Sequence, residues 1–430
     1  MKKHLYIWVL SVLLLIAAAF ALRLAFFKSS DGKSGNGILA IGAGTAAGMP
    51  PPLSDTTAKM PSPHNIVKWR VPISSQMECM TGTLWHDSNR WVVGERSGRI
   101  TALSSDRSIR WQVTHSNQNW QAIAPLGSGN LVAVSFQGTV CLLDVSDGKI
   151  LWKRETDGTF MHAPLLGWMK DEDKTYVMWQ LSQSDSTIFC LRVSDGELLW
   201  KSEPSNRCDG RPALWDNKLV FGNCDGVVYV VDANTGKSLG TIETGGQSDP
   251  MAGEMVAVWG PELMVTGTYL GNFLLLDPKT MTLLDKVKIA DSETFATPVV
   301  IGDSTVAMGT PDGRITLWDT RERKLQSKGE IHVSKDGIDE IVFDDDVGID
   351  NENDEFVNKK DLWVLAGRTL NRVCLKSQDV QTFNIGDNMK YLTKSYWGSK
   401  LALLADGDVV CLDLVTVVRG VPAVQKGKTE

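Results

Sequence analysis

Short apolar runs separated by tight turns recur along most of this chain. In residues 218–243, one apolar run covers residues 219–221 and a second covers residues 227–231 and ends at Asp232. A glycine-containing turn separates the two runs, and a third strand-like segment follows Gly236. Glycine between runs of Val, Ile, Tyr and Phe is typical of a β-hairpin, because glycine readily adopts the positive φ that such turns require. The segment therefore predicts three consecutive antiparallel strands.

The residue that ends the second run aligns the copies of this unit. The aligned positions are Ser104, Asp144, Arg192, Asp232, Asp277, Asp319, Lys376 and Asp413. In every copy the two residues before the aligned position are apolar, as at Val230 and Val231. Since neighbouring residues of a strand point to opposite faces of the sheet, two adjacent apolar positions indicate a strand that is covered on both faces.

The spacing of the aligned positions indicates the architecture. They recur every 37 to 57 residues, which is typical of units that each form one four-stranded propeller blade. An apolar segment before each copy, such as residues 212–215, supplies the fourth strand. Blades that stack face to face would cover both faces of each sheet. The pattern predicts an all-β fold, an eight-bladed β-propeller over residues 65–420.

Three of the units carry a family resemblance. The segments are QGTVCLLDVSDGKILWK, STIFCLRVSDGELLWK and DGVVYVVDANTGKSLG, and they resemble the quinoprotein-type repeat. The resemblance extends over about residues 66 to 420 and implies a propeller in which an outer-strand tryptophan packs between blades. Trp111, Trp152 and Trp200 match that tryptophan. A WD-repeat protein is the alternative, suggested by residues 314–324 alone.

The two ends of the chain differ from the repeat. Residues 1–28 have a basic start and an uncharged apolar stretch at 5–22, about the length that crosses a bilayer. A retained membrane anchor is favoured over a cleaved signal peptide, with the propeller outside the cytoplasm because Lys2 and Lys3 precede the apolar stretch. Residues 29–64, rich in Gly, Ala, Ser and Pro, predict a flexible linker, and residues 421–430 form a tail.

Residues 66–72 predict how the ring closes. They resemble an outer strand, with Trp69 at the tryptophan position, yet they precede the first unit. The last unit has no convincing outer strand of its own. We therefore expect residues 66–72 to complete the last blade, the alternative being that Trp69 belongs to an ordinary linker.

Charge and cysteine content limit the partners and the cross-links. A formal net charge of −7 argues against nucleic acid, which binds basic surfaces. Of the 7 cysteines, Cys190, Cys374 and Cys411 align with apolar strand positions and are predicted to be core residues, since equivalent positions in separate blades lie too far apart to bond. Cys208 and Cys224 stand in loops at one end of the same unit, and a disulfide between them is a hypothesis.

An acidic insertion interrupts the seventh unit at residues 334–361. A solvated loop is the favoured interpretation, because insertions of this kind are well tolerated in loops. A calcium site is the alternative, since closely spaced carboxylates are the oxygen ligands that calcium prefers. Its candidate ligands are Asp344, Asp346, Asp350 and Asp354. Their spacing does not match an EF-hand loop.

The candidate functional residues are those of the loops that lead into each unit, which would gather at one end of the central channel. We expect these loops to bind a partner protein, and the selected residues are Met77, His162, Arg207, Arg211, Glu254 and Glu340. No catalytic triad, zinc spacing or phosphate loop is present in the sequence, so no catalytic residue, metal or cofactor is predicted.

The favoured function is a non-catalytic envelope scaffold. The chain resembles the BamB-like family of outer-membrane assembly factors, which implies envelope or membrane proteins as partners and a location on the periplasmic side. A quinoprotein dehydrogenase that uses pyrroloquinoline quinone and calcium is an alternative, although the adjacent cysteine pair of many such enzymes is absent. A sensor or ligand-binding ectodomain is another.

Overall fold

The computed structural model describes most of the repeat region. The described residues are 67–73, 79–85, 90–104, 106–126, 129–344, 361–384, 389–394, 401–405 and 408–412. The chain divides into two units, Met1–Lys59 and Met60–Glu430, and every described residue belongs to the second. The apolar segment 5–22, the linker 29–64, Met77 and the tail lie outside the described residues.

Within those ranges the strands group into eight four-stranded antiparallel sheets. The first four sheets, each given by its four strands, are β2 Cys79–Trp85, β3 Arg90–Glu95, β4 Arg99–Leu103 and β5 Ile109–Thr114; β6 Trp120–Leu126, β7 Asn130–Ser135, β8 Thr139–Asp144 and β9 Ile150–Glu155; β10 Leu165–Trp168, β11 Tyr176–Leu181, β12 Ile188–Arg192 and β13 Leu198–Lys201; and β14 Ala213–Trp215, β15 Lys218–Gly222, β16 Val227–Asp232 and β17 Ser238–Glu243.

The other four sheets are built in the same way. They are β18 Val256–Val258, β19 Leu263–Gly267, β20 Asn272–Asp277 and β21 Thr282–Lys288; β22 Val299–Ile301, β23 Thr305–Gly309, β24 Arg314–Asp319 and β25 Gln326–His332; β26 Ile338–Asp344, β27 Asp361–Ala366, β28 Thr369–Cys374 and β29 Val380–Asn384; and β30 Met389–Lys394, β31 Leu401–Ala405, β32 Asp408–Leu412 and β1 Val67–Pro72. One 3-10 helix, η2 Gly246–Ser248, follows β17.

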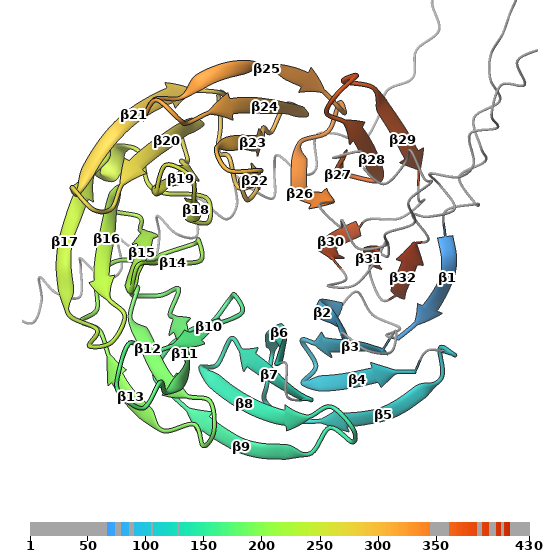
Figure 1. Ribbon diagram of the computed structural model, residues 1–430. Helices are drawn as coiled ribbons and strands as arrows, with labels where there is room; N and C mark the ends of the chain where they lie inside the picture. The colour runs from blue at the N-terminus through green and yellow to red at the C-terminus, as the bar shows by residue number, and fades with distance from the viewer. Residues whose placement is uncertain are drawn as a thin grey trace, which may run out of the picture. The chain divides into compact units, whose positions relative to one another are not determined.

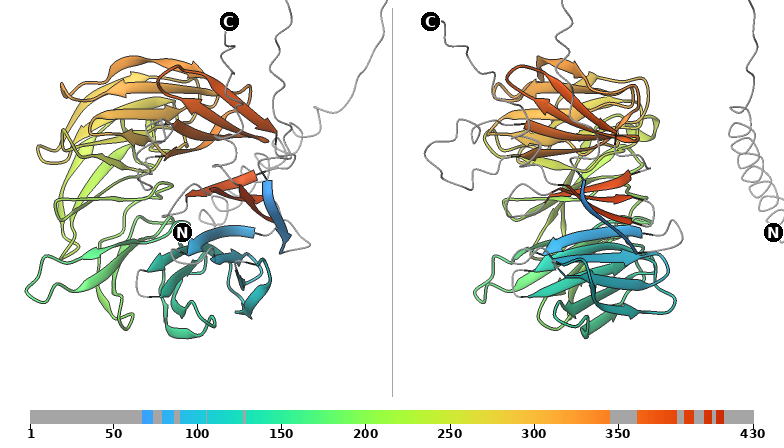
Figure 2. Two further views of the ribbon diagram at one scale, coloured as in Figure 1. Left: turned by 45° about the vertical axis from the view of Figure 1, so that its right-hand side comes forward. Right: turned by 90° about the vertical axis from the view of Figure 1, so that its right-hand side faces the viewer.

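The sheets of the second unit surround a central opening. In seven sheets the first strand in the chain lies nearest the opening and the fourth lies at the rim, as for β14 and β17, and in the eighth β30 lies nearest the opening and β1 at the rim (Figure 1). Figure 2 shows the sheets stacked beside one another around the ring. β1 pairs antiparallel with β32, with Trp69 opposite Cys411. The first described strand is therefore the outer strand of the sheet that holds the last three.

The paired apolar positions are buried on both sides, as the sequence pattern predicts. Val230 and Val231 in β16, and Leu275 and Leu276 in β20, are all at most 4% exposed. Adjacent residues pack into different clusters: Val230 contacts the next sheet in the chain, whereas Val231 contacts the preceding one. Each sheet is therefore covered by two neighbours, and the core is a series of interfaces between sheets.

The turn after the third strand is built by the aligned residue. In the fourth sheet the Asp232 carboxylate accepts hydrogen bonds from the backbone N–H groups of Asn234 and Thr235, and Gly236 N–H donates to the Asp232 carbonyl oxygen over 2.9 Å. Such side-chain capping of a turn is the usual role of aspartate in this position.

The alignment of the seventh unit was wrong by two residues. Asp361 pairs with Cys374, as Lys218 pairs with Asp232 in the fourth sheet. Gln378 N–H also donates to the Cys374 carbonyl oxygen over 2.8 Å. Cys374 therefore occupies the aspartate position, whereas Lys376 lies within the turn. The apolar run that includes Leu375 extends past the strand end, which misplaced the alignment.

Outer-strand tryptophans join neighbouring sheets. Trp111 Nε1 donates a 2.8 Å hydrogen bond to the Val145 carbonyl oxygen in the next sheet, and its ring covers Gly148, where an added Cβ would lie 2.6 Å from the ring. Trp152 makes the same hydrogen bond to Val193 over 2.9 Å. The tryptophan of the quinoprotein-type repeat thus packs between sheets here.

The third interface departs from this pattern. Trp200 lies against Gly236 in the same way, but the equivalent carbonyl oxygen, that of Ala233, accepts its hydrogen bond from Trp179 Nε1 over 2.9 Å. Trp200 Nε1 is buried and has no hydrogen-bond partner within the described part of the chain. At this interface the carbonyl acceptor is therefore paired with Trp179 instead of the outer-strand tryptophan.

Candidate interaction surface

Among the described residues, one end of the ring gathers two kinds of loop. We call it the entry end: it holds the loops that lead from an outer strand into the next sheet and the turns between second and third strands. The two meet through a repeated contact, in which the residue after the outer strand donates its N–H to the carbonyl oxygen of a turn glycine. Examples are Thr156 to Gly138 over 3.0 Å and Val333 to Gly313 over 2.9 Å. The entry end is therefore a connected surface.

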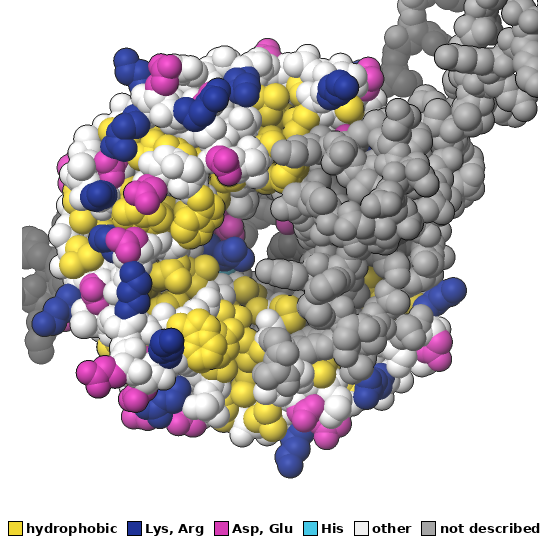
Figure 3. Space-filling model, in the orientation of Figure 1, with side chains coloured by type: hydrophobic (Ala, Val, Ile, Leu, Met, Phe, Trp, Pro, Cys, Tyr) yellow, Lys and Arg dark blue, Asp and Glu magenta, His cyan; other side chains and the backbone are white. Residues whose placement is uncertain are grey.

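Side chains of different kinds are distributed unevenly on the ring. Figure 3 shows one face, and on its coloured part many hydrophobic side chains lie toward the central opening while most Lys, Arg, Asp and Glu side chains lie along the rim. The entry end carries exposed apolar residues of its own, namely Phe136, Leu270 and Phe295.

Asp209 is the centre of a polar cluster on the entry end. Arg207 Nε and Gln183 Nε2 each donate a 2.8 Å hydrogen bond to Asp209 Oδ1, and the Tyr269 hydroxyl donates a 2.6 Å hydrogen bond to Oδ2. Gln183 comes from the third sheet, Arg207 and Asp209 from the loop into the fourth, and Tyr269 from the fifth. One carboxylate therefore ties three sheets together, and its side chain is only 9% exposed.

The hydrogen bonds of Asp209 determine its charge. Burial opposes ionisation and on its own would raise the pKa of Asp209. The hydrogen bonds from Tyr269, Arg207 and Gln183 outweigh burial and hold the pKa below the usual value for aspartate. Burial raises the pKa of Tyr269, and its hydrogen bond to Asp209 raises that pKa further. At neutral pH Asp209 is therefore an ionised carboxylate that accepts hydrogen bonds from three donors.

A second group of charges lies next to Asp209. His162 Nε2 lies 2.9 Å from the Asp209 carbonyl oxygen, and its Nδ1 lies 3.8 Å from Glu254 Oε1. Arg211 Nε lies 3.5 Å from the same Glu254 oxygen. These three residues come from the loops into the third, fourth and fifth sheets. The Arg207 and Arg211 side chains remain 57% and 41% exposed, so the cluster presents positive charge to solvent, with Arg207 anchored by Asp209.

The structure brings together four of the six residues that the sequence selected. His162, Arg207, Arg211 and Glu254 lie in the two groups around Asp209. Glu340 lies on another sheet, in β26, opposite Leu365 of β27, and Met77 is outside the described residues. Gln183 and Tyr269 were missed because only the loops into each sheet were searched. The turns between second and third strands, which reach the same end, would have identified both.

The hypothesis of a Cys208–Cys224 disulfide is wrong for this structure, in which both are free thiols. Cys208 is buried, and its Sγ lies 2.9 Å from the Gly222 carbonyl oxygen. Cys224 Sγ lies 3.9 Å from Asp209 Oδ2. The two side chains are held by different acceptors, one in the core and one in the polar cluster. Burial raises the pKa of Cys208 to about 12.

The candidate calcium ligands fall mostly outside the described residues. Asp344 ends β26 and pairs with Asp361, whereas Asp346, Asp350 and Asp354 are not among the described residues. Among those that are described, no group of three or more His, Cys, Asp or Glu side chains has the arrangement of a metal site. Across these same parts of the chain, no helix has the length and apolar character needed to span a membrane.

Comparison with known proteins gives one family and several structures. The family model described as "Outer membrane protein assembly factor BamB" matches residues 96–185 and 169–358, more than half of the chain. A search of curated proteins finds no match.

Solved structures share the fold at low sequence identity. BamB from Moraxella catarrhalis has a TM-score of 0.60 at 16% identity, over 81% of this chain and 99% of that one. The computationally designed Ika8 protein has a TM-score of 0.61 at 17% identity, over 80% and 98%. Sqt1 from Saccharomyces cerevisiae has a TM-score of 0.62 at 14% identity, over 81% and 98%.

Proposed function

The chain belongs to the family described as "Outer membrane protein assembly factor BamB", and on that basis we propose that it is a non-catalytic scaffold of the cell envelope. In this proposal its eight sheets are the blades of one propeller, and its entry end binds other envelope proteins during outer-membrane protein assembly. Residues 5–22 hold the chain in the inner membrane, with the propeller on the periplasmic side.

The arginines of the entry end carry this proposal. Arg207 is held by Asp209, Arg211 lies 3.5 Å from Glu254, and the exposed ring of Phe295 lies edge-on to Tyr269 with ring centroids 5.2 Å apart. Arginine and aromatic side chains are enriched at protein interfaces and at their energetic hot spots. Side chains that are already held in place lose less conformational entropy on binding. The surface is therefore suited to a protein partner.

Site-specific crosslinking in the envelope tests the proposal. A photoreactive phenylalanine derivative replaces Phe295 on the entry end and, as the matched control, Trp259 on the turn between β18 and β19 at the opposite end. Both side chains are exposed, at 50% and 65%. We expect the Phe295 position to crosslink to an outer-membrane assembly protein, identified by mass spectrometry, and the Trp259 position to give no such product. The same product from both positions, or none from Phe295, would contradict the proposal.

The alternatives give different results. A quinoprotein dehydrogenase would change the absorbance spectrum of added pyrroloquinoline quinone in the presence of calcium and would oxidise an alcohol or sugar substrate. A sensor ectodomain would crosslink to a signalling membrane protein. The scaffold predicts neither result.

A further inference from the structure

The outer strand of each sheet has a free edge at the rim of the ring. These strands are β5, β9, β13, β17, β21, β25, β29 and β1, and no described strand pairs with the outer side of any of them (Figure 1). A free edge presents unpaired N–H and C=O groups that can pair with another strand. Charged side chains, proline and β-bulges are the usual features that prevent such pairing.

Seven of the eight outer strands carry one extra residue opposite the third strand of their sheet. In β17, Gly240 pairs with Val230 and Ser238 pairs with Val231, so Leu239 has no partner. This shift of the register is the mark of a β-bulge, which bends and twists an edge strand. The extra residues are Lys68, Arg110, Leu151, Leu199, Leu239, Leu284 and Lys328.

β29 is the exception among these strands. Residues 380–384 pair one for one with residues 369–373 of β28, without a shift in register. Val380 pairs with Val373, and the next residue, Gln381, pairs with Arg372. The extra residue is therefore missing from this strand, and its free edge keeps the regular spacing of an ordinary β-strand.

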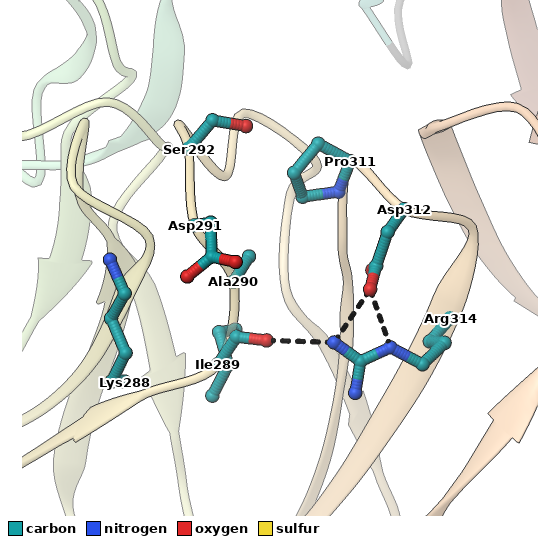
Figure 4. Close-up of a pocket in the computed structure, with 8 residues that line it drawn as sticks. All are labelled: Lys288, Ile289, Ala290, Asp291, Ser292, Pro311, Asp312 and Arg314. Atoms are coloured by element: carbon teal, nitrogen blue, oxygen red, sulfur yellow. Dashed lines mark hydrogen bonds and ion pairs between the residues drawn. The ribbon is translucent and has the colours of Figure 1, made fainter.

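β29 also differs from the other outer strands in its side chains. Its sequence, VQTFN, contains no Asp, Glu, Lys, Arg or Pro. Each of the other seven contains a charged residue, such as Arg110 in β5 or Glu243 in β17, and β1 also contains Pro72. In β21 the last residue is Lys288, whose side chain lines a pocket beside Arg314 of the next sheet (Figure 4). β29 thus lacks all three features that prevent edge pairing.

The composition of β29 suits pairing with a second copy of itself. A twofold axis places two identical edge strands antiparallel, so each residue meets a residue of the same uncharged strand. Like charges directly opposite each other are destabilising, and the other seven strands would bring their own charges and bulges to such a pair. The turn before β29 carries two exposed charges, Lys376 and Asp379, which are opposite in sign.

We propose that β29 is a dimerisation edge, at which two copies of this chain pair their β29 strands antiparallel about a twofold axis. With all 5 residues of the strand paired, Thr382 lies opposite Thr382 of the second copy, and its side chain is exposed in the single chain. This edge lies at the rim, outside the Asp209 cluster. The proposal therefore does not rest on the scaffold role.

The oligomeric state of the purified full chain tests the proposal. Sedimentation velocity over a wide range of concentration should show a reversible dimer of the wild type. Thr382→Lys places two lysines opposite each other in the pair, so we expect the association constant to fall by about fivefold or more.

A matched variant separates the β29 edge from a general effect of added charge. Thr241→Lys makes the same change at the equivalent exposed position of β17, since Thr241 pairs with Tyr229 as Thr382 pairs with Asn371. It should leave the association constant unchanged. A wild type that stays monomeric at every concentration, or equal association of the wild type and Thr382→Lys, would overturn the proposal.

Crosslinking in the cell distinguishes a second copy from another partner. A photoreactive phenylalanine derivative at position 382 should give a product that contains two copies of this chain, identified by mass spectrometry. A product formed only with a different protein, or no product of two copies, would show that β29 is not a dimerisation edge. Neither result changes the crosslinking expected at Phe295, so the two proposals fail separately.

Discussion

The indole nitrogen of Trp152, on the outer strand of one sheet, donates a 2.9 Å hydrogen bond to the carbonyl oxygen of Val193 in the next sheet. Its ring also covers Gly196, where an added Cβ would lie 2.6 Å from the ring. A polar contact and a close packing contact are thus made by one side chain. At this point the relative position of the two neighbouring sheets is fixed by a hydrogen bond as well as by packing.

Replacing Trp152 and Trp200 by phenylalanine should have different effects. Trp152→Phe removes a hydrogen bond and leaves the Val193 acceptor unpaired, so we expect the free energy of unfolding to fall by about 1 kcal/mol. Trp200→Phe removes a buried donor that has no partner among the described residues, so it should lose only the packing of the larger ring and should cost less than Trp152→Phe. Urea unfolding at neutral pH measures both, and equal losses would contradict this account of the third interface.

Alanine at two turn glycines should separate backbone strain from a steric clash. Gly236 has φ +73° and would place a Cβ 2.4 Å from the Trp200 ring, whereas Gly302 has φ +64° and open space around its Cβ. Gly302→Ala should cost about 1 to 2 kcal/mol, the strain of a left-handed residue. Gly236→Ala should cost clearly more, because the Trp200 ring must also move. Thermal unfolding of the two variants side by side gives the difference, and similar melting temperatures would show that the ring adjusts freely.

The stability contributed by Asp209 should depend on pH. Its folded-state pKa is lowered, because three hydrogen bonds outweigh burial. A lowered pKa contributes stability that is present above the unfolded value, about 3.9, and is lost as pH falls through the folded value. Asp209→Asn should therefore be destabilised at pH 7, and its difference from the wild type should shrink below about pH 4.

Urea midpoints measured across that pH range test the Asp209 prediction. Asp303→Asn, in an exposed turn at the opposite end, is the control for the loss of one negative charge. A difference between wild type and Asp209→Asn that stays constant down to acid pH would show that the carboxylate charge does not hold the cluster.

Alkylation should detect free thiols at Cys208 and Cys224. In denaturant without reductant, both residues should be modified, as intact mass and peptide mapping would report. In the folded protein Cys208 should be protected, because it is buried and burial raises its pKa to about 12. Modification that requires a reductant would restore the disulfide hypothesis.

Removing β1 should destabilise the sheet that holds the last three strands. A chain that starts at residue 74 lacks the partner of β32, which leaves the N–H and C=O groups of an edge strand unpaired and prone to association. We expect a lower melting temperature and more light scattering than for a chain that starts at residue 66. Identical melting curves would show that the β1 pairing contributes little.

The repeat made the strands and their stacking predictable. Adjacent apolar pairs such as Val230 and Val231 require a strand that is covered on both faces, and the Asp232 to Gly236 turn carries its own local chemistry. These properties depend on residues close together in the chain, so the sequence alone was enough. The same reasoning failed at Cys374, where the aspartate of the turn is absent and the apolar run continues past the strand end.

The functional surface was only partly predictable for a physical reason. Loop order identified His162, Arg207, Arg211 and Glu254 as neighbours at one end of the ring, because each precedes the first strand of a sheet. The role of Asp209 as acceptor for Gln183 and Tyr269 depends on side chains from three sheets, and their sequence separations follow no repeat. The sequence by itself determined the strands, the turns and the covered faces through local patterns. Only the tertiary structure decided which loop side chains meet, because hydrogen bonds between sheets depend on how whole sheets pack.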